Sequence, residues 1–239
     1  MADEDQKIDV CVTPSFQSAN IRALKEYDSD TAPLFGPVES AFDLALQTVA
    51  SIDDARTAAE NDLTLTANAR VVMTADFADR VTERATRAFD YANTTLTNNV
   101  AALEKLLAEP VQSLAANSSV SREIRDHVRG LKAEGGSAMS FVTNCINSGD
   151  FASASAVLGV PYYLSGLTPE AQTVLLRMFN EKQNPQNARC LAAAKAAQAY
   201  LDRNSGLLWK QVEMAVGGDY RKIASLRKGA KASKRAFGV

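Results

Sequence analysis

The chain has 239 residues, of which 46% are hydrophobic but only 7% aromatic, and its formal net charge is −2. This length is enough for one large or two small domains with a real core. Alanine supplies much of the apolar content, which favours closely packed helices over a β-sheet, because a sheet would require more β-branched and aromatic residues. The charge of the whole chain gives no indication of a nucleic-acid partner.

Residues 1–36 show no sustained hydrophobic period. They begin with an acidic run and contain Pro14, Pro33 and Gly36. We predict an extended N-terminal arm over residues 1–36, with a short helix at 18–26. No charged and then apolar leader opens the chain, and no apolar run approaches the ~20 residues of a membrane helix, so we expect neither secretion by that route nor a membrane span.

A first helix is predicted from Pro37 to Asn61, followed by a long central helix over 62–109 with Asp62 or Thr64 as its cap. The central stretch contains neither proline nor glycine, and residues 93–99, rich in Asn and Thr, are its weakest point. Its apolar and small residues repeat as heptads, which predicts a seam that requires helical partners. The seam consists of Val71, Ala75, Ala78, Thr82, Ala85, Phe89, Ala92, Leu96, Asn99, Leu103 and Leu106, of which Phe89, Leu96 and Leu103 are a candidate assembly surface.

Shorter helices are predicted after residue 117. One spans 138–146, and another begins at the cap pair Thr168 and Pro169. A final helix over 190–215 is expected to bend at Gly206 and to end at residues 217–218. The inward residues are predicted to be Ile124, Val128 and Leu131; Val142, Cys145 and Ile146; Ala171, Val174, Leu175 and Met178; and Cys190, Ala194, Ala197, Leu201, Leu208, Val212 and Ala215. The expected fold is therefore all-α, an elongated helical bundle over 37–218 around the central helix, with a possible boundary near 110–120.

Residues 219–239 form a basic C-terminal tail. They carry seven lysines and arginines against one aspartate, a net charge of +6, whereas the rest of the chain carries 19 cations and 27 anions, a net charge of −8. Residues 219–231 are predicted to form a short amphipathic helix. It is a candidate contact for nucleic acid or for an acidic protein surface, including that of another copy, and the alternative is a solubilising disordered end. The candidate contact residues are Arg221, Lys222, Arg227, Lys228, Lys231, Lys234 and Arg235.

We predict no catalytic, metal or cofactor site. The single histidine, His127, lies in a charged segment and is expected to face solvent, and Cys11, Cys145 and Cys190 lack the close spacing of metal ligands. We interpret the cysteines as reduced thiols, and the many carboxylates as residues of solvated helix faces. The aromatic residues Tyr162, Tyr163 and Trp209 allow two interpretations, as stacking platforms for bases or as helix-packing anchors, and their apolar neighbours favour the second.

Residues 149–168 carry the run Gly-Asp-Phe, then Ala-Val-Leu-Gly-Val-Pro-Tyr-Tyr-Leu-Ser-Gly-Leu-Thr from Ala156. This pattern resembles small helical proteins of tailed bacteriophages and prophages, and the likeness extends through the Asn-Pro break to residue 216. The resemblance implies a viral or prophage origin and a structural or assembly role, and it carries no catalytic residue. It also implies a location in the cytoplasm of a bacterial host or within a virion.

The expected function is that of a non-enzymatic protein acting through association, as a phage virion or assembly component. Its partners would be other virion proteins and copies of itself, bound through the arm and any free part of the seam. The alternative is a nucleic-acid-binding regulatory module that uses the basic tail.

Overall fold

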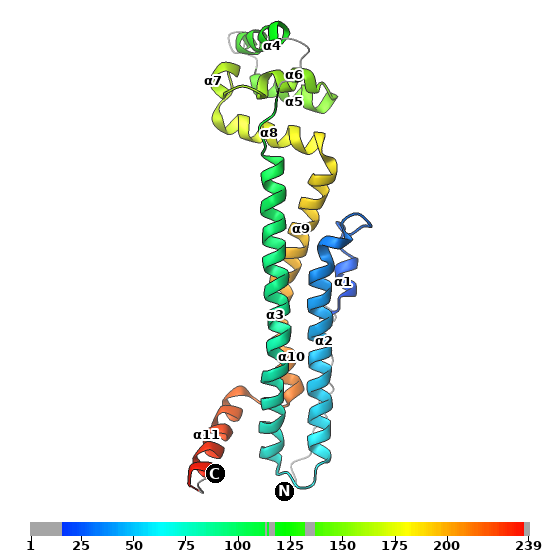
Figure 1. Cartoon of the computed structure of the whole chain (residues 1–239), viewed down its shortest axis with the longest axis vertical. Helices are drawn as coiled ribbons and strands as arrows, with labels where there is room; N and C mark the ends of the chain where they lie inside the picture. Colours follow the sequence, from blue (N-terminus) through cyan, green and yellow to red (C-terminus); the bar gives the residue numbers. More distant parts are fainter. Residues whose placement is uncertain (1–15, 113, 115–117, 132–136, 237–239) are drawn as a thin grey trace. The chain divides into compact units, whose positions relative to one another are not determined.

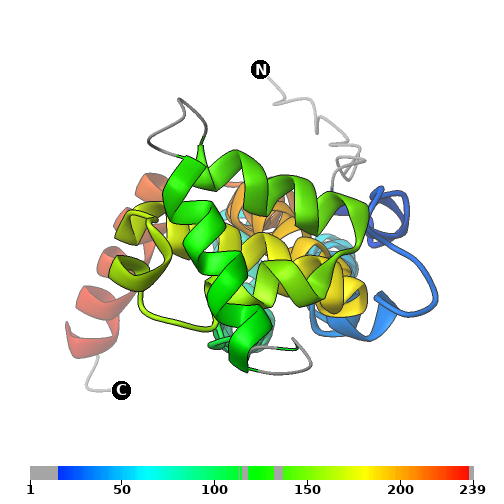
Figure 2. The ribbon, with the colours of Figure 1, turned by 90° about the horizontal axis from the view of Figure 1, so that it is seen from above.

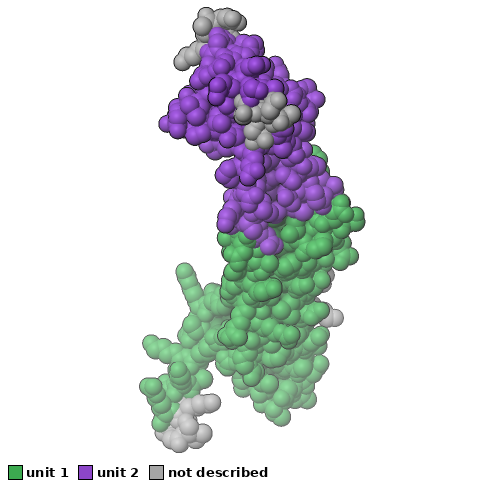
Figure 3. Space-filling view, turned by 45° about the horizontal axis from the view of Figure 1, so that its top comes forward, with its two compact units in different colours: residues 1–98, 193–239 green, residues 99–192 purple. Residues whose placement is uncertain are grey.

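The computed structural model describes residues 16–112, 114, 118–131 and 137–236, and every regular element in these ranges is a helix. The all-α fold class is therefore confirmed. The chain divides into two compact units, residues 1–98 with 193–239 and residues 99–192, shown in green and purple in Figure 3. The divisions fall after residues 98 and 192, whereas the sequence suggested a boundary near 110–120.

Unit 1 is built from helices at both ends of the chain. In Figure 1, α2 and the first part of α3 lie side by side, and α10 packs on α2. The helices of unit 1 are α1 (Ala19–Arg22), α2 (Ala32–Asn61), the first part of α3 (Ala67–Leu107), the later part of α9 (Pro185–Asn204), α10 (Leu207–Val216) and α11 (Tyr220–Ala236).

The described part of the predicted N-terminal arm packs into unit 1. Phe16 and Ile21 are fully buried, and α2 begins at Ala32, five residues earlier than predicted. The helix starts early because Pro33 occupies its first turn, where a missing N–H costs nothing, and it continues through Pro37. Residues 16–36 are therefore not an extended arm, and the rest of that predicted arm, residues 1–15, lies outside the described residues.

Asp62 and Thr64, the predicted cap residues of the central helix, form a turn between α2 and α3 instead. Asp62 Oδ1 accepts hydrogen bonds from the Thr64 amide at 2.8 Å and from the Thr64 hydroxyl at 2.6 Å. The N-terminal cap of α3 is Thr66 instead, because its Oγ1 accepts a hydrogen bond from the Ala69 amide at 3.3 Å. The two hydrogen bonds from Thr64 hold the pKa of Asp62 below its usual value, chiefly the one from the Thr64 hydroxyl.

Helix α3 runs without a break through residues 93–99. The predicted seam is buried from Ala75 to Leu96, but Leu103 is only half-buried, Leu106 is exposed and Leu107 takes the inward position. An α-helix has 3.6 residues per turn, so a strict heptad pattern drifts by about 20° per heptad, and after several heptads the buried stripe has moved to a neighbouring position. The heptad assignment is therefore wrong at its C-terminal end.

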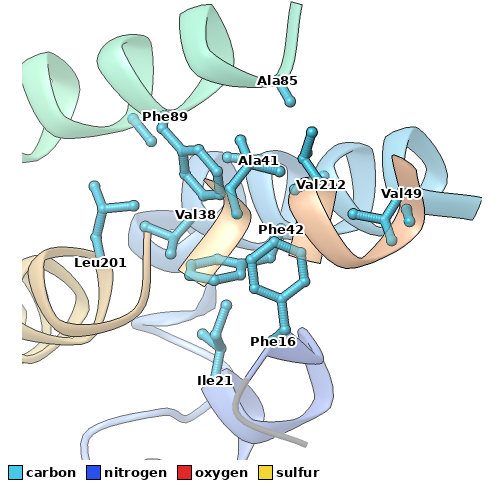
Figure 4. Close-up of a cluster of buried hydrophobic side chains, with 14 of the residues drawn as sticks. Phe16, Ile21, Val38, Ala41, Phe42, Val49, Ala85, Phe89, Leu201 and Val212 are labelled. Carbon is cyan, nitrogen blue, oxygen red and sulfur yellow. The ribbon is translucent and has the colours of Figure 1, made fainter. Parts of the chain in front are cut away.

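The core of unit 1 centres on the Phe42 ring of α2 (Figure 4). Its centroid lies 5.5 Å from that of Phe16, 5.0 Å from that of Phe89 on α3 and 5.4 Å from that of Tyr200 on α9, all in edge-to-face geometry. Alanines fill the remaining helix contacts and allow the helices to approach closely, as the composition predicted; they are Ala41, Ala45, Ala75, Ala78, Ala85, Ala92, Ala193, Ala197 and Ala215.

Unit 2 is a second helical core, whose helices cross one another in Figure 2. The predicted inward residues Val142, Cys145 and Ile146 are buried. On α8, Leu175 is buried but Val174 is 49% exposed, because Phe179 and Asn180 complete the inner face instead. The helices of unit 2 are the end of α3, α4 (Ser118–Leu131), α5 (Ala138–Ser148), α6 (Phe151–Leu158), α7 (Tyr162–Ser165), α8 (Pro169–Gln183) and the start of α9.

A buried amide ties α8 to the end of α3 within unit 2. Asn180 Nδ2 donates hydrogen bonds to the carbonyl oxygens of Leu107, at 2.9 Å, and of Glu109, at 3.0 Å. These carbonyls lie at and just beyond the C-terminus of α3, where no further helical turn supplies donors. Asn180 therefore acts as a cap supplied from a distant helix.

Candidate interaction site

The basic tail forms the helix α11, which packs against α3 of the same unit. Gly217 has a φ of 70°, a left-handed conformation that ends α10 and turns the chain. At Gly218 an added Cβ would lie 3.0 Å from Val71 Cγ1, so this close approach to α3 favours glycine. Ile223 is then buried in the core of unit 1, which anchors the first turn of α11.

One arginine of the tail faces two aspartates of α3. Arg227 Nη2 lies 2.7 Å from Asp76 Oδ1 and 2.7 Å from Asp79 Oδ2, and the two carboxylates are one helical turn apart. Burial by itself would lower the pKa of Arg227, but the hydrogen bonds and charges of Asp79 and Asp76 raise it above its ordinary value. The side chains are partly exposed, so the pairing orients α11 more than it stabilises the fold.

A groove of about 890 Å³ lies along the junction of α3 and α11. We call it the α3–α11 groove. Met73, at 59% exposed, is its most exposed large apolar residue, while Asp76, Asp79 and Arg80 supply charge. The apolar lining comes from Leu65, Ala69, Val72 and Met73 on the α3 side and from Leu226 and Ala230 on α11.

The structure separates the seven predicted contact residues of the tail. Arg227 turns towards α3, whereas five cations remain exposed along α11, and nothing is described for the side chain of Lys234. The exposed cations are Arg221, Lys222, Lys228, Lys231 and Arg235. The tail thus forms the amphipathic helix α11 (Tyr220–Ala236), and the alternative of a solubilising disordered end does not describe these residues.

Other helices of the same chain cover most of the candidate assembly surface. Phe89 and Leu96 are buried in the core of unit 1, and Leu103 belongs to unit 2, where it is half-buried. Phe89 packs on Phe42 of α2 within the same chain. Because partners within the chain cover these two side chains, the prediction of Phe89 and Leu96 as an assembly surface is wrong.

The predicted packing anchors are exposed. Tyr162 and Tyr163 lie on the short helix α7 with their rings 5.6 Å apart, and Trp209 lies on α10 with 53% of its surface exposed. Their apolar sequence neighbours suggested burial, but the buried neighbours are Leu167, in the link after α7, and Leu208 on α10, and these rings stay outside.

The described histidine and cysteines form no metal-binding group. His127 is exposed, with its ring 5.5 Å from that of Phe141, and Cys145 is buried while Cys190 is half-buried. Cys11 lies outside the described residues. In the described ranges, no group of three or more His, Cys, Asp or Glu residues is placed to hold a metal ion. No helix found there is long and apolar enough to cross a membrane.

Sequence reasoning missed the α3 side of this site. The carboxylates at positions 76 and 79 appeared as part of a solvated face, although their spacing of three places both on one side of a helix. No periodic pattern in the sequence marks the exposed Met73, because this residue lies beside the seam and not in it. Comparisons of the chain with protein-family models, curated proteins and solved structures find no match.

Proposed function

We propose that the chain is a non-enzymatic structural protein that acts through association, as a virion or assembly component of a tailed bacteriophage. The observation that supports association is the α3–α11 groove, where exposed Met73 and half-buried Leu226 line an apolar surface at the edge of a helical bundle. Exposed apolar surfaces rimmed by polar groups mark sites of protein interaction. The phage assignment is supported by the resemblance of residues 149–216.

The first partner is a second copy of the chain. Asp76 and Asp79 line the α3 side of the groove, and exposed cations lie along α11, whose Leu226 and Ala230 line the other side. Two copies brought together at this edge can therefore place carboxylates of one opposite cations of the other, which favours encounter and fixes the register. Other virion proteins would join through the faces that this contact leaves free.

Sedimentation equilibrium of the full chain tests the association. We expect concentration-dependent self-association at micromolar concentration, and we expect Met73→Glu to weaken it by about tenfold or more, because a charge would be buried in an apolar contact. The matched control is Met139→Glu, since Met139 is an exposed methionine of unit 2. A monomer at all concentrations, together with absence of the chain from purified particles of the encoding phage, would contradict the proposal.

A second candidate function, a nucleic-acid-binding module, is favoured by the exposed cations on α11. Each cation placed at a phosphate releases a counterion, so binding would fall steeply as salt rises. Fluorescence anisotropy with labelled duplex DNA at about 50 and 200 mM salt would measure this dependence. We expect Lys228→Gln with Lys231→Gln to reduce the salt dependence if this candidate is correct, and unchanged binding after deletion of residues 219–239 would exclude it.

A further inference from the structure

A small pocket in unit 1 combines aromatic rings with carboxylates. It has a volume of about 280 Å³ and lies where α3, α10 and the start of α11 meet. It shares only Asp79 with the α3–α11 groove. We call it the Trp209 pocket, and it is lined by Asp79, Thr82, Glu83, Trp209, Val212 and Tyr220.

The two aromatic residues of the Trp209 pocket expose much of their surface. Trp209 is 53% exposed and Tyr220 is 44% exposed, whereas Val212 is buried beside them. Rings that pack for stability alone bury most of their area, so these two leave ring surface available for a ligand. The negative face of an aromatic ring attracts ammonium and guanidinium groups, most strongly for tryptophan.

The polar residues of the pocket favour the same kind of ligand. Asp79 and Glu83 lie one turn apart on α3, and Thr82, which is only 2% exposed, has a hydroxyl oxygen without a hydrogen-bond partner among the described residues. The pKa of Tyr220 is raised, first by burial and then by the negative charges of Glu213 and Asp79, which indicates a negative potential at its hydroxyl.

Both carboxylates have existing partners that an incoming cation must share or replace. Glu83 pairs with Arg87 at 2.5 Å, but both side chains are mostly exposed, and such surface pairs contribute little. Asp79 pairs with Arg227, which also binds Asp76. A new cation can therefore approach Glu83 without leaving Arg227 unpaired.

The size of the pocket indicates a side chain as the occupant. Pockets for whole small molecules usually have volumes of about 300–1,000 Å³ and enclose most of the ligand. At about 280 Å³, the Trp209 pocket, which two exposed rings line, lies just below this range. It fits the end of one long cationic side chain better than an enclosed metabolite.

We propose that the Trp209 pocket binds the arginine or lysine side chain of a partner polypeptide, with the cation between the rings of Trp209 and Tyr220 and against Glu83. The site does not depend on association through the α3–α11 groove, so self-association can fail without affecting it. The acidic pocket would then be the receptor for a basic segment of the partner.

Fluorescence titration of the full chain provides the test, because Trp209 is the only tryptophan. The probe is a short acetylated and amidated peptide with one arginine between glycines, and its matched control replaces arginine with citrulline, which has the same shape without the charge. We expect a saturable change in Trp209 emission with the arginine peptide and a much smaller one with the citrulline peptide. Tetramethylammonium chloride is the third probe, and binding of this salt without binding of the peptide would overturn the assignment to a side chain.

Two variants connect the signal to the pocket. We expect Tyr220→Leu to weaken arginine-peptide binding by about fivefold and Glu83→Gln to weaken it by about threefold. Tyr91→Leu is the control, since Tyr91 is an exposed tyrosine of α3 outside the pocket. Circular dichroism checks the fold of Tyr220→Leu, and the exposed position of Glu83 keeps the test decisive if that variant unfolds. Equal binding of the arginine and citrulline peptides, or unchanged binding in Glu83→Gln, would overturn the proposal.

Discussion

Arg227 Nη2 donates a hydrogen bond to Asp79 Oδ2 at 2.7 Å, across a separation of 148 residues in the sequence. The same nitrogen lies 2.7 Å from Asp76 Oδ1. The contact joins the basic C-terminal helix to the acidic face of α3. Because this contact forms only in the folded chain, the α3–α11 groove also exists only there. The exposed cations of the tail lie on the outer face of α11.

Replacement of Arg227 by methionine should loosen α11 more than it destabilises unit 1. The ion pairs are partly exposed, so we expect a loss of less than about 1 kcal/mol in the free energy of unfolding. We also expect faster amide hydrogen exchange across residues 224–236, measured by mass spectrometry, because the anchor at Ile223 remains while the second contact is lost. Lys228→Met is the control on the exposed side of α11, and equal exchange in the two variants would show that Arg227 does not hold the helix.

Replacement of Asn180 by aspartate should destabilise unit 2. The change removes the two N–H donors to the carbonyls of Leu107 and Glu109 and places a carboxylate against them. We expect the free energy of unfolding to fall by about 2 kcal/mol, which urea denaturation would measure. Asn144→Asp, at an exposed position of α5, should change it little. A similar loss in both variants would argue against the capping role.

The thiol of Cys145 should react slowly in the folded protein. Burial raises its pKa first, and the charge of Asp150 raises it further, so little of the nucleophilic thiolate forms at neutral pH. With Cys190→Ser and Cys11→Ser in the background, we expect alkylation by iodoacetamide to be slow without denaturant and to accelerate in urea. Rapid alkylation of the folded chain, followed by mass spectrometry, would show that the core of unit 2 is open.

The turn at Asp62 should contribute to stability above acidic pH and lose that contribution in acid. Hydrogen bonds from Thr64 lower the pKa of Asp62 below its ordinary value of 3.8 in the folded state. The unfolded state therefore takes up the proton first, and the contribution of Asp62 is complete above pH 3.8 and disappears as the pH falls through the lower folded value. Unfolding free energies of the natural chain and of Asp62→Ala should converge in this window. A difference that is independent of pH would contradict this.

The all-α fold class and many helix ends follow from the sequence because they depend on local physics. Thr168 caps α8 through a hydrogen bond from the Ala171 amide at 3.2 Å, as its position before Pro169 predicts. Gly217 ends α10 in the left-handed conformation that glycine adopts without strain. In each case, residues within one turn of each other determine the geometry.

Only the tertiary structure decided which residues meet across the chain. The seven cations of the tail are equivalent in sequence. Of the six whose side chains the structure describes, Arg227 is the one placed against Asp76 and Asp79, because the glycine turn and Ile223 set the rotation of α11. Phe89 and Leu96 have the pattern of an assembly surface, yet partners within the chain bury them. Periodicity identifies an apolar face but does not name its partner, since the partner depends on contacts between segments far apart in sequence.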